Sequence, residues 1–350
     1  MTEAGTGRRG ADVPRGRVTA ADGLLVVDKP AGWTSHDVVA RARRLAATKK
    51  IGHAGTLDPM ATGVLVLGVG RATRLLTYLV GADKEYRATV RLGQATVTDD
   101  AEGDVVDSAG AAPLLRADGT ADTAAVEAAL AGLRGPIDQV PSAVSAIKVD
   151  GERAYARVRQ GEDVALPARP VTIHRLDLTA PPRAAVVGGT TVLDLDVVVG
   201  CSSGTYVRAL ARDLGAALGT GGHLTALRRT RVGPFTLDGA RTMADLVAEV
   251  AAQVGEPDPA GLRTVTMTQA ATASFPVRRL DAGQTAAVRV GKSLGATCVP
   301  AAGERVAVAH ARGGPGHDRV TAALAPDGHV VALLADRAGR ARPVLVLDPA

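Results

Sequence analysis

The spacing of apolar residues along the chain predicts several strands. Leu24 to Val27 is a short apolar run that ends in Asp-Lys-Pro, which is typical of a strand entering a turn. A longer apolar run from Val64 to Val69 predicts a second strand. Apolar and polar residues alternate from Glu85 to Gly93 and from Leu193 to Val197, and this period of two predicts strands with one buried face.

Helical patterns lie between these strands. Thr34 and Asp37 have the spacing of a capping box, and apolar residues follow at helical intervals. Asp122 precedes an alanine-rich segment with the same periodicity, and residues 205–218 are also helical in character. The mixture of strands and helices predicts an α+β protein.

Composition divides the chain into four segments. Residues 1–20 carry four arginines without an apolar stretch, so we expect a disordered basic tail rather than a secretory signal. Residues 21–255 hold the elements above, and the mixture of Pro, Gly, Thr and Ala in 256–274 predicts a linker. Residues 275–350 are expected to form a small β-barrel from short strands between Gly-rich turns. These strands are predicted at 287–290, 305–310, 329–334 and 344–347.

Bulk properties limit the class of protein. Hydrophobic residues make up 46% of the 350 but aromatic residues only 2%, so the core must consist of Val, Leu and Ala. The two cysteines, Cys201 and Cys298, form no C-x-x-C pair, which excludes a zinc ribbon and disfavours a disulfide framework. No apolar run reaches the roughly 18 residues that cross a bilayer. We therefore expect a soluble, cytoplasmic protein without a membrane partner.

The most informative segment is Ile51 to Gly63, in which a single carboxylate, Asp58, lies among glycines, threonines and a proline. This composition disfavours helix and strand interiors and suits a tight loop that fixes one side chain. An isolated Asp before Pro most often closes a turn or caps a helix. The complete segment resembles the catalytic loop of the bacterial tRNA pseudouridine synthases of the TruB family, in which the Asp of G-x-L-D-P-x-A-T-G is the nucleophile.

Two further catalytic residues are implied by this resemblance. The run from Cys201 to Arg208 is similar to the second family signature, whose Arg pairs with the nucleophile, and Arg208 occupies that place. A guanidinium is suited to this task because its fork binds a carboxylate through two bonds and stays charged. Lys84-Glu85-Tyr86 resembles the K-x-Y motif, so Tyr86 is expected to stack on the target base and to move a proton. Outside the motifs, Arg208 would be read as a surface residue and Tyr86 as a core residue.

The same resemblance implies four substrate-binding residues. His53 corresponds to the family histidine beside the displaced bases, although a loop histidine can equally be a simple hydrogen-bonding residue. Asp100 matches an acidic position near the flipped nucleotides, but Asp99 stands where serine is common. The acidic spacing around Asp100 does not fit a calcium loop. Tyr206 belongs to the second signature, and Leu227 matches an apolar residue that packs around the target base.

Basic residues near these motifs are candidates for contacts with RNA phosphates, because phosphate binding depends on Lys and Arg. Pro141 to Lys148 and Gly151 to Tyr155 resemble the RNA-gripping loop of the family. For charges alone, a solvated surface is the alternative reading. The RNA-contacting candidates are Lys49, Lys50, Lys148, Arg228 and Arg229.

The resemblance extends from about Gly23 to Arg231, and the β-rich tail resembles the PUA-type RNA-binding domains of these enzymes. It implies a catalytic domain with a mixed, mainly antiparallel sheet flanked by helices. It also implies isomerisation of uridine 55 in the T loop of tRNA. The base must be flipped out of the RNA for this reaction. Neither redox change nor phosphate transfer occurs, so we expect no cofactor and no metal. We expect a monomer whose partner is the T arm of tRNA.

The sequence also bears on three other functions. Most glycoside hydrolases need two opposed carboxylates, and no second one is evident near Asp58. A nucleotide-binding enzyme is disfavoured because Gly68-Val69-Gly70 lacks the third glycine of the fingerprint and no P-loop occurs. A non-catalytic RNA-binding protein with a PUA-like module remains the alternative, and replacing Asp58 by Asn separates it from the enzyme.

Overall fold

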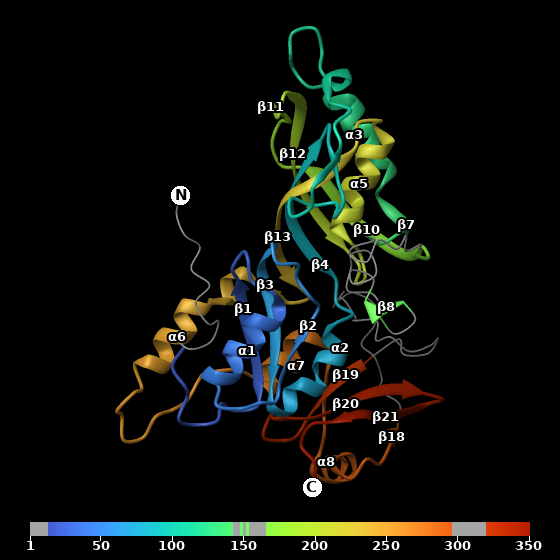
Figure 1. The fold of residues 1–350 in the computed structure, drawn as a ribbon. Coiled ribbons are helices and arrows are strands. Elements are labelled where there is room, and N and C mark those ends of the chain that lie inside the picture. Colours follow the sequence, from blue (N-terminus) through green and yellow to red (C-terminus); the bar gives the residue numbers. More distant parts are fainter. Residues whose placement is uncertain (1–12, 143–147, 150–151, 154–165, 296–319) are drawn as a thin grey trace. The chain divides into compact units, whose positions relative to one another are not determined.

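The computed structural model describes residues 13–142, 148–149, 152–153, 166–295 and 320–350. The chain divides into two compact units, the first made of residues 1–83 and 231–350 and the second of residues 84–230 (Figure 1). Among the described residues, no helix combines the length and the apolar character needed to cross a membrane.

The central strand of the first unit is β1 (Gly23–Lys29), which pairs antiparallel with β3 (Thr62–Val69) along its whole length. β2 (Ile51–Ala54) extends this sheet on β3, and two short strands extend it on β1. These are β15 (Arg241–Thr242), which is parallel to β1, and β16 (Val265–Thr266), which is antiparallel. The strands predicted at 24–27 and 64–69 are thereby confirmed.

Helix α1 (Ser35–Leu45) begins at the predicted capping box. The Thr34 hydroxyl accepts the Asp37 N–H at 3.1 Å, and the Asp37 carboxylate accepts the Thr34 N–H at 2.9 Å. Such a reciprocal pair satisfies two donors that the first helical turn leaves without partners. Val38, Ala42 and Leu45 are buried, as their spacing predicted.

The prediction that residues 1–20 form a disordered tail is wrong for residues 13–20, the part that the structure describes. The Gly16 N–H donates to Arg44 O at 3.1 Å, the Ala20 N–H donates to Ala46 O at 3.0 Å, and Val13 is buried. Residues 13–20 therefore pack along the end of α1, because their backbone groups bond to that helix. Residues 1–12 lie outside the described part.

The prediction of a linker at residues 256–274 is also wrong, because this segment contains β16 and helix α7 (Met267–Ser274). Thr266 and Gln269 form a capping box at the start of α7. Ala270 and Ala271, on α7, are completely buried in the core of the first unit. Helix α6 (Met243–Ala251) precedes this region and begins with a capping box of its own.

The C-terminal segment forms a five-stranded sheet with the order β17-β19-β20-β21-β18, which confirms the predicted β-rich module (Figure 1). Its strands are β17 (Val277–Arg279), β18 (Leu294–Gly295), β19 (Val320–Leu324), β20 (Val330–Arg337) and β21 (Arg340–Val346). The strand predicted at 287–290 is wrong, because Asp281 and Gln284 cap helix α8 (Ala282–Arg289) there. The strand predicted at 305–310 lies outside the described residues.

This C-terminal sheet shares a hydrophobic core with the N-terminal part of the first unit. Leu333 and Leu345 pack in one cluster with Leu24 and Leu75. The Tyr78 hydroxyl donates to Val344 O at 2.9 Å across the same interface. The C-terminal sheet is thus part of the first unit, which also carries the Asp58 loop, and is not a separate compact unit.

The second unit is built on the strand order β13-β4-β12-β10-β7, with β11 also paired to β12. Tyr86 on β4 lies opposite Val199 on β12, and Lys84 lies opposite Cys201. Along β4 the side chains of Tyr86, Ala88, Val90 and Leu92 are buried while Arg87 is exposed, which confirms the predicted alternation. Its strands are β4 (Lys84–Leu92), β7 (Gly135–Gln139), β10 (Arg169–Leu178), β11 (Arg183–Val187), β12 (Thr190–Cys201) and β13 (Gly222–Val232).

Two predicted helices of this unit are confirmed as α3 (Thr123–Gly132), capped by Asp122, and α5 (Val207–Ala217). The chain as a whole is α+β, with mainly antiparallel sheets and flanking helices, as predicted. The remaining elements are β5 (Ala95–Thr96), β6 (Val105–Asp107), β8 (Lys148–Val149), β9 (Glu152–Arg153), β14 (Phe235–Thr236), α2 (Leu76–Leu79) and the 3₁₀ turns Gly70–Arg74, Ala112–Leu114 and Leu237–Gly239.

Candidate active site

Asp58 lies on the loop between β2 and β3, and its side chain is partly exposed. Gly55 and Gly63, at the two ends of the loop, have φ of 86° and 100°, in the left-handed region that favours glycine. The Asp58 carbonyl accepts the Ala61 N–H at 3.1 Å, which closes a turn directly after the carboxylate. The glycine-rich composition therefore serves the tight loop that the sequence predicted.

Hydrogen bonds fix this loop on both sides of Asp58. On one side, the Leu57 N–H donates to Ser35 Oγ at 2.9 Å and the Ser35 hydroxyl lies 3.2 Å from Leu57 O. On the other side, Pro59 O accepts the Gly32 N–H at 2.8 Å and the Lys29 ammonium at 3.2 Å. Both neighbours of Asp58 are thus tied to residues that lie more than twenty positions earlier in the chain.

Lys29 is completely buried, and its ammonium also donates to Pro30 O at 2.9 Å and to Trp33 O at 2.5 Å. A buried cation is tolerated only where polar groups replace its hydration, and these carbonyls do so. The roles of Lys29 and Ser35 were not predicted from the sequence. The Asp-Lys-Pro turn is visible there, but no local pattern indicates that the lysine bonds to a loop thirty residues away.

His53 lies on β2, where its ring packs edge-on against the ring of His36, with centroids 5.7 Å apart and planes at 82°. The basic residues of α1 are partly used inside the unit: Arg43 donates to Ile51 O at 2.9 Å, and Arg44 donates to Val13 O. Lys49 and Lys50 are exposed. Arg43 and Arg44 are exposed as well, but they use part of their hydrogen-bonding capacity within the unit.

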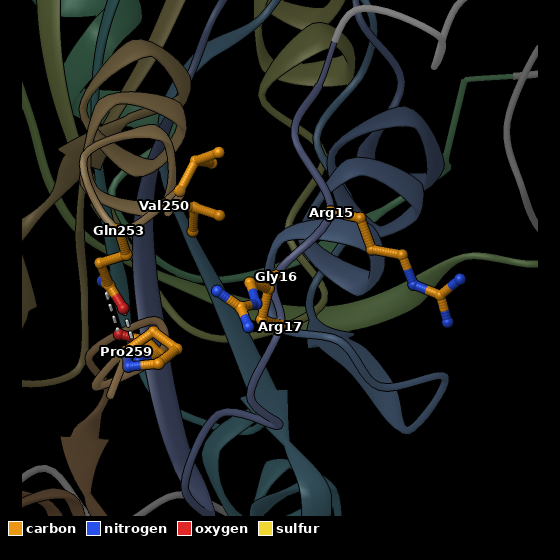
Figure 2. A pocket seen from close by; sticks show the side chains of 8 residues that line it. Arg15, Gly16, Arg17, Val250, Gln253 and Pro259 are labelled. Atoms are coloured by element: carbon orange, nitrogen blue, oxygen red, sulfur yellow. Dashed lines mark hydrogen bonds between the residues drawn. The ribbon is translucent and has the colours of Figure 1, made fainter. Parts of the chain in front are cut away.

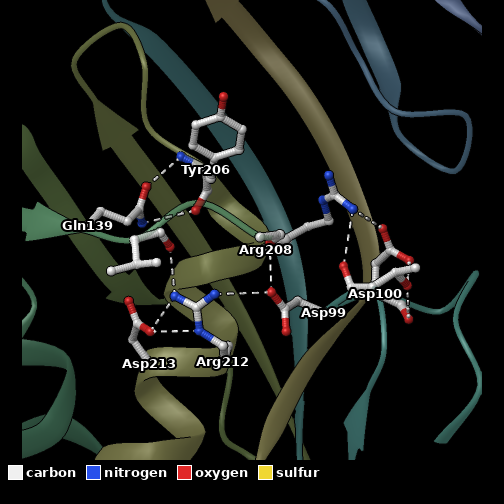
Figure 3. A network of polar contacts seen from close by, with 10 residues as sticks. Asp99, Asp100, Gln139, Tyr206, Arg208, Arg212 and Asp213 are labelled. Atoms are coloured by element: carbon white, nitrogen blue, oxygen red, sulfur yellow. Dashed lines mark hydrogen bonds and ion pairs between the residues drawn. The ribbon is translucent and has the colours of Figure 1, made fainter. Parts of the chain in front are cut away.

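Arg208, in the second unit, is bound by Asp100. Its Nη1 lies 3.1 Å from Asp100 Oδ2, and the two side chains are only 8% and 2% exposed. The same Nη1 donates to Thr98 O at 3.1 Å, and the Asp100 carboxylate accepts the Thr98 hydroxyl at 2.5 Å and the Glu102 N–H at 3.0 Å (Figure 3). The sequence had placed Asp100 near the flipped nucleotides and had not predicted this ion pair.

Tyr206 immediately precedes α5, and its main chain is held by one side chain. The Gln139 amide donates to Tyr206 O at 3.0 Å and accepts the Tyr206 N–H at 2.7 Å (Figure 3). This pair fixes the start of the helix that carries Arg208. The role of Gln139 was not predicted from the sequence either.

The remaining predicted residues of the second unit differ in exposure. Tyr86 and Leu227 are buried, each with only 7% of its surface exposed. Arg228 is partly exposed and Arg229 is almost completely buried. Lys148 lies on β8, and most of the proposed RNA-gripping segment around it falls outside the described residues. The phosphate contacts proposed for Lys148 and Arg228 stay predictions, whereas the burial of Arg229, which is 1% exposed, argues against its contact with a phosphate.

The structure therefore brings Arg208 and Asp100 together, and it places Tyr86, Tyr206 and Leu227 in the same unit. Asp58 and His53 belong to the first unit. The pairing of Asp58 with Arg208 stays a prediction. Within the described ranges, no cluster of three or more His, Cys, Asp or Glu side chains is arranged to hold a metal ion.

A small pocket lies elsewhere in the first unit, between the N-terminal segment and the turn after α6 (Figure 2). Gln253 shapes it, because its side chain accepts the Gly261 N–H at 2.7 Å. None of the predicted site residues lines this pocket, so we assign it no part in catalysis. The labelled lining residues are Arg15, Gly16, Arg17, Val250, Gln253 and Pro259.

Known structures resemble this fold over nearly the whole chain. A structure described as an H/ACA RNP bound to a substrate RNA containing 2′-deoxyuridine matches with a TM-score of 0.62 and 25% identity, covering 93% of this chain and 85% of that chain. A Cbf5-Nop10-Gar1 complex matches with a TM-score of 0.62 and 23% identity, covering 97% and 93%. The second likeness concerns the fold alone.

Proteins related in sequence share a higher identity with this chain than these structures do. A protein of Arthrobacter sp. (strain FB24) named tRNA pseudouridine synthase B is 58% identical over 329 residues, covering 93% of this chain and 97% of the relative. A protein of the same name from Thermobifida fusca (strain YX) is 51% identical over 326 residues, covering 93% and 98%.

Three family descriptions match successive parts of the chain. The TruB family pseudouridylate synthase N-terminal domain matches residues 43–207, and the tRNA pseudouridylate synthase B C-terminal domain matches residues 208–267. The C-terminal domain of tRNA pseudouridine synthase II matches residues 275–348, in the segment that forms the five-stranded sheet. The hydrogen-bonded Asp58 loop and the Arg208–Asp100 pair lie on the motifs that the resemblance identified. Together with them, these matches show that the chain belongs to the TruB family of pseudouridylate synthases.

Proposed function

We propose that this protein is a tRNA pseudouridine synthase that converts uridine 55 in the T loop to pseudouridine, with Asp58 as nucleophile. The observation that carries the proposal is the position of Asp58. Asp58 is a partly exposed residue on a loop whose adjoining residues are hydrogen-bonded on both sides. A nucleophile held in this way loses little conformational freedom when it attacks.

The reaction rearranges bonds within one nucleotide. The N1–C1′ bond breaks, the base turns while it is held, and a C5–C1′ bond forms; C5 gives up its proton and N1 takes one up. Asp58 forms a covalent bond to the nucleotide, at C1′ or at C6, and is released at the end. No electron is gained or lost overall, so the reaction needs no redox cofactor.

Arg208 and Tyr86 complete the proposed centre. Arg208 holds the Asp58 carboxylate ionised and oriented, and Asp100 in turn holds Arg208. Tyr86 stacks on the base and moves the proton. His53 contacts the displaced bases, and Leu227 and Tyr206 line the base site. The RNA backbone binds Lys49, Lys50, Lys148 and Arg228. The protein acts in the cytoplasm as a monomer, on the T arm of tRNA.

The test is to incubate a T-stem-loop RNA with the protein, without added cofactor, and to map pseudouridine. We expect product at the uridine corresponding to position 55 and none with Asp58→Asn, while RNA affinity stays largely unchanged. Asp107→Asn is the matched control, because Asp107 is an exposed carboxylate on β6. RNA binding without product by the wild-type protein would favour the non-catalytic RNA-binding alternative. Full activity of Asp58→Asn would refute the nucleophile.

A further inference from the structure

Two consecutive carboxylates bind two arginines that are one turn apart on α5. Asp100 binds Arg208, and Asp99 Oδ2 lies 3.3 Å from Nη1 of Arg212 (Figure 3). Residues four positions apart on a helix lie on the same face, so both ion pairs join the same loop to the same side of α5. The Asp100–Arg208 pair is buried, whereas the side chains of Asp99 and Arg212 are 14% and 32% exposed.

The backbone at Asp99 is specialised for this arrangement. Its φ is 59°, in the left-handed region that Asp and Asn adopt more readily than other non-glycine residues. The Asp99 carbonyl also accepts the Leu224 N–H at 3.0 Å, which fixes the loop to β13. The direction of the chain at Asp99 therefore determines where the next residue, Asp100, presents its carboxylate.

The same cluster holds the chain that follows β7. The Ser142 hydroxyl donates to Asp99 Oδ2 at 2.6 Å, and Arg212 Nη2 donates to Val140 O at 2.8 Å. Ser142 is completely buried. Asp99 thus bonds to α5 through Arg212 and to the end of the β7 segment through Ser142.

The Asp99 carboxylate depends on these partners for its charge. Burial is the main cause that raises the pKa of Asp99 above its ordinary value, and the charge of Asp213 adds to this. The hydrogen bond from Ser142 and the charges of Arg212 and Arg208 oppose the rise. An amide at this position would keep an acceptor for Ser142 but would lose the attraction to Arg212.

We propose that Asp99 is a positioning residue for the isomerisation: through Arg212 and Ser142 it fixes the loop that presents Asp100 to Arg208. This inference rests on the proposed function, in which Arg208 orients Asp58. Partly exposed ion pairs contribute little net stability, so the pair with Arg212 acts on geometry more than on folding.

The experiment compares Asp99→Asn with wild type in single-turnover reactions on a T-stem-loop RNA, together with RNA affinity and melting temperature. Asparagine tolerates the left-handed backbone, so the loop can keep its path. We expect a single-turnover rate about tenfold lower at saturating protein, as for the loss of one coupled contact. The RNA dissociation constant should stay within about twofold of wild type and the melting temperature within about 2 °C, as for an ion pair that is partly exposed.

Arg212→Gln should slow the reaction at least as much, because it removes the pair with Asp99 and the bond to Val140 O. The double variant should be no slower than Arg212→Gln, because the Asp99–Arg212 pair can be lost only once. Asp107→Asn is again the matched control with wild-type rate. A wild-type rate for Asp99→Asn, or a rate loss that only parallels a fall in melting temperature, would overturn the positioning role. If Asp58→Asn is inactive in that case, the proposed function stands and only this inference fails; if Asp58→Asn is active, the proposed function fails.

Discussion

The ammonium of Lys29 donates to the carbonyl of Pro59, the residue that follows Asp58, over 3.2 Å. Lys29 lies at the end of β1, opposite Gly63 on β3, so the central strand pair of the first unit places this cation beneath the loop. The loop geometry is therefore determined by the sheet and by a buried charge, as well as by the glycines of the loop itself.

Lys29→Met should destabilise the protein and deform the loop. Three carbonyls would lose a charged donor, and Pro59 O would keep only its bond from the Gly32 N–H among those described above. We expect a loss of about 3 kcal/mol of unfolding free energy, the scale for buried acceptors that lose a charged donor. Urea unfolding measures it, with Lys49→Met as an exposed control that should stay within about 0.5 kcal/mol. Equal stability of Lys29→Met and wild type would contradict the role of this cation.

Asp100→Asn should cost stability and activity together. The change removes the charge from one member of a buried ion pair, and breaking such a pair costs about 3–5 kcal/mol. The isomerisation rate should fall as well, because Arg208 loses the group that orients it. Calorimetry and single-turnover rates measure the two effects, and Asp107→Asn should change neither. An unaltered melting temperature in Asp100→Asn would show that the buried ion pair does not stabilise the fold.

Local sequence signals predicted local structure well. The capping box of Thr34 and Asp37 starts α1, and the alternation along β4 predicts which side chains are buried. The same capping spacing occurs in Asp281-x-x-Gln284 and in Thr266-x-x-Gln269. Both segments begin helices, whereas the composition had predicted a strand at 287–290 and a linker at 256–274.

Contacts between distant residues could not be predicted from any local pattern. Asp100 and Arg208 are 108 positions apart, and Ser35 and Leu57 are 22 apart. The motifs identified Asp58, Arg208 and Asp100 as candidates through resemblance alone. Which carboxylate Arg208 binds, and which residues hold the Asp58 loop, depend on the register of sheets that only the folded chain defines.

The shared core of the first unit predicts that damage to the C-terminal sheet reaches the Asp58 loop. Leu333 packs in the cluster that also contains Leu24 and Leu75, and Leu333→Ala should cost about 2–5 kcal/mol. Trp33, the single tryptophan, lies beside this loop, since its carbonyl accepts from Lys29. The unfolding transition that Trp33 fluorescence reports should therefore occur at a lower urea concentration in Leu333→Ala than in wild type. Val290→Ala, at a 59% exposed position, should leave the midpoint unchanged. An unshifted Trp33 transition in Leu333→Ala would mean that the two parts unfold separately.

A cluster of charges closes the C-terminal end of the chain. His329 Nε2 lies 2.8 Å from Asp348 Oδ2, its Nδ1 contacts Asp327, and Arg289 lies 2.6 Å from Asp348. The hydrogen bond to Asp348 is the main cause that raises the pKa of His329 above its ordinary value of 6.5, although partial burial opposes this. In return, His329 holds the pKa of Asp348 below its ordinary value of 3.8.

The two shifts predict opposite pH dependences. The raised pKa of His329 adds stability that is fully present below pH 6.5 and is lost as the pH rises through the folded-state value. The lowered pKa of Asp348 adds stability that is present above pH 3.8 and is lost as the pH falls through its folded-state value. His329→Gln should therefore lower the melting temperature most between pH 3.8 and 6.5, and the difference should vanish in alkaline buffer. His174→Gln, at an exposed histidine, is the matched control. A melting difference for His329→Gln that stays constant from pH 5 to pH 9 would refute the role of its protonation.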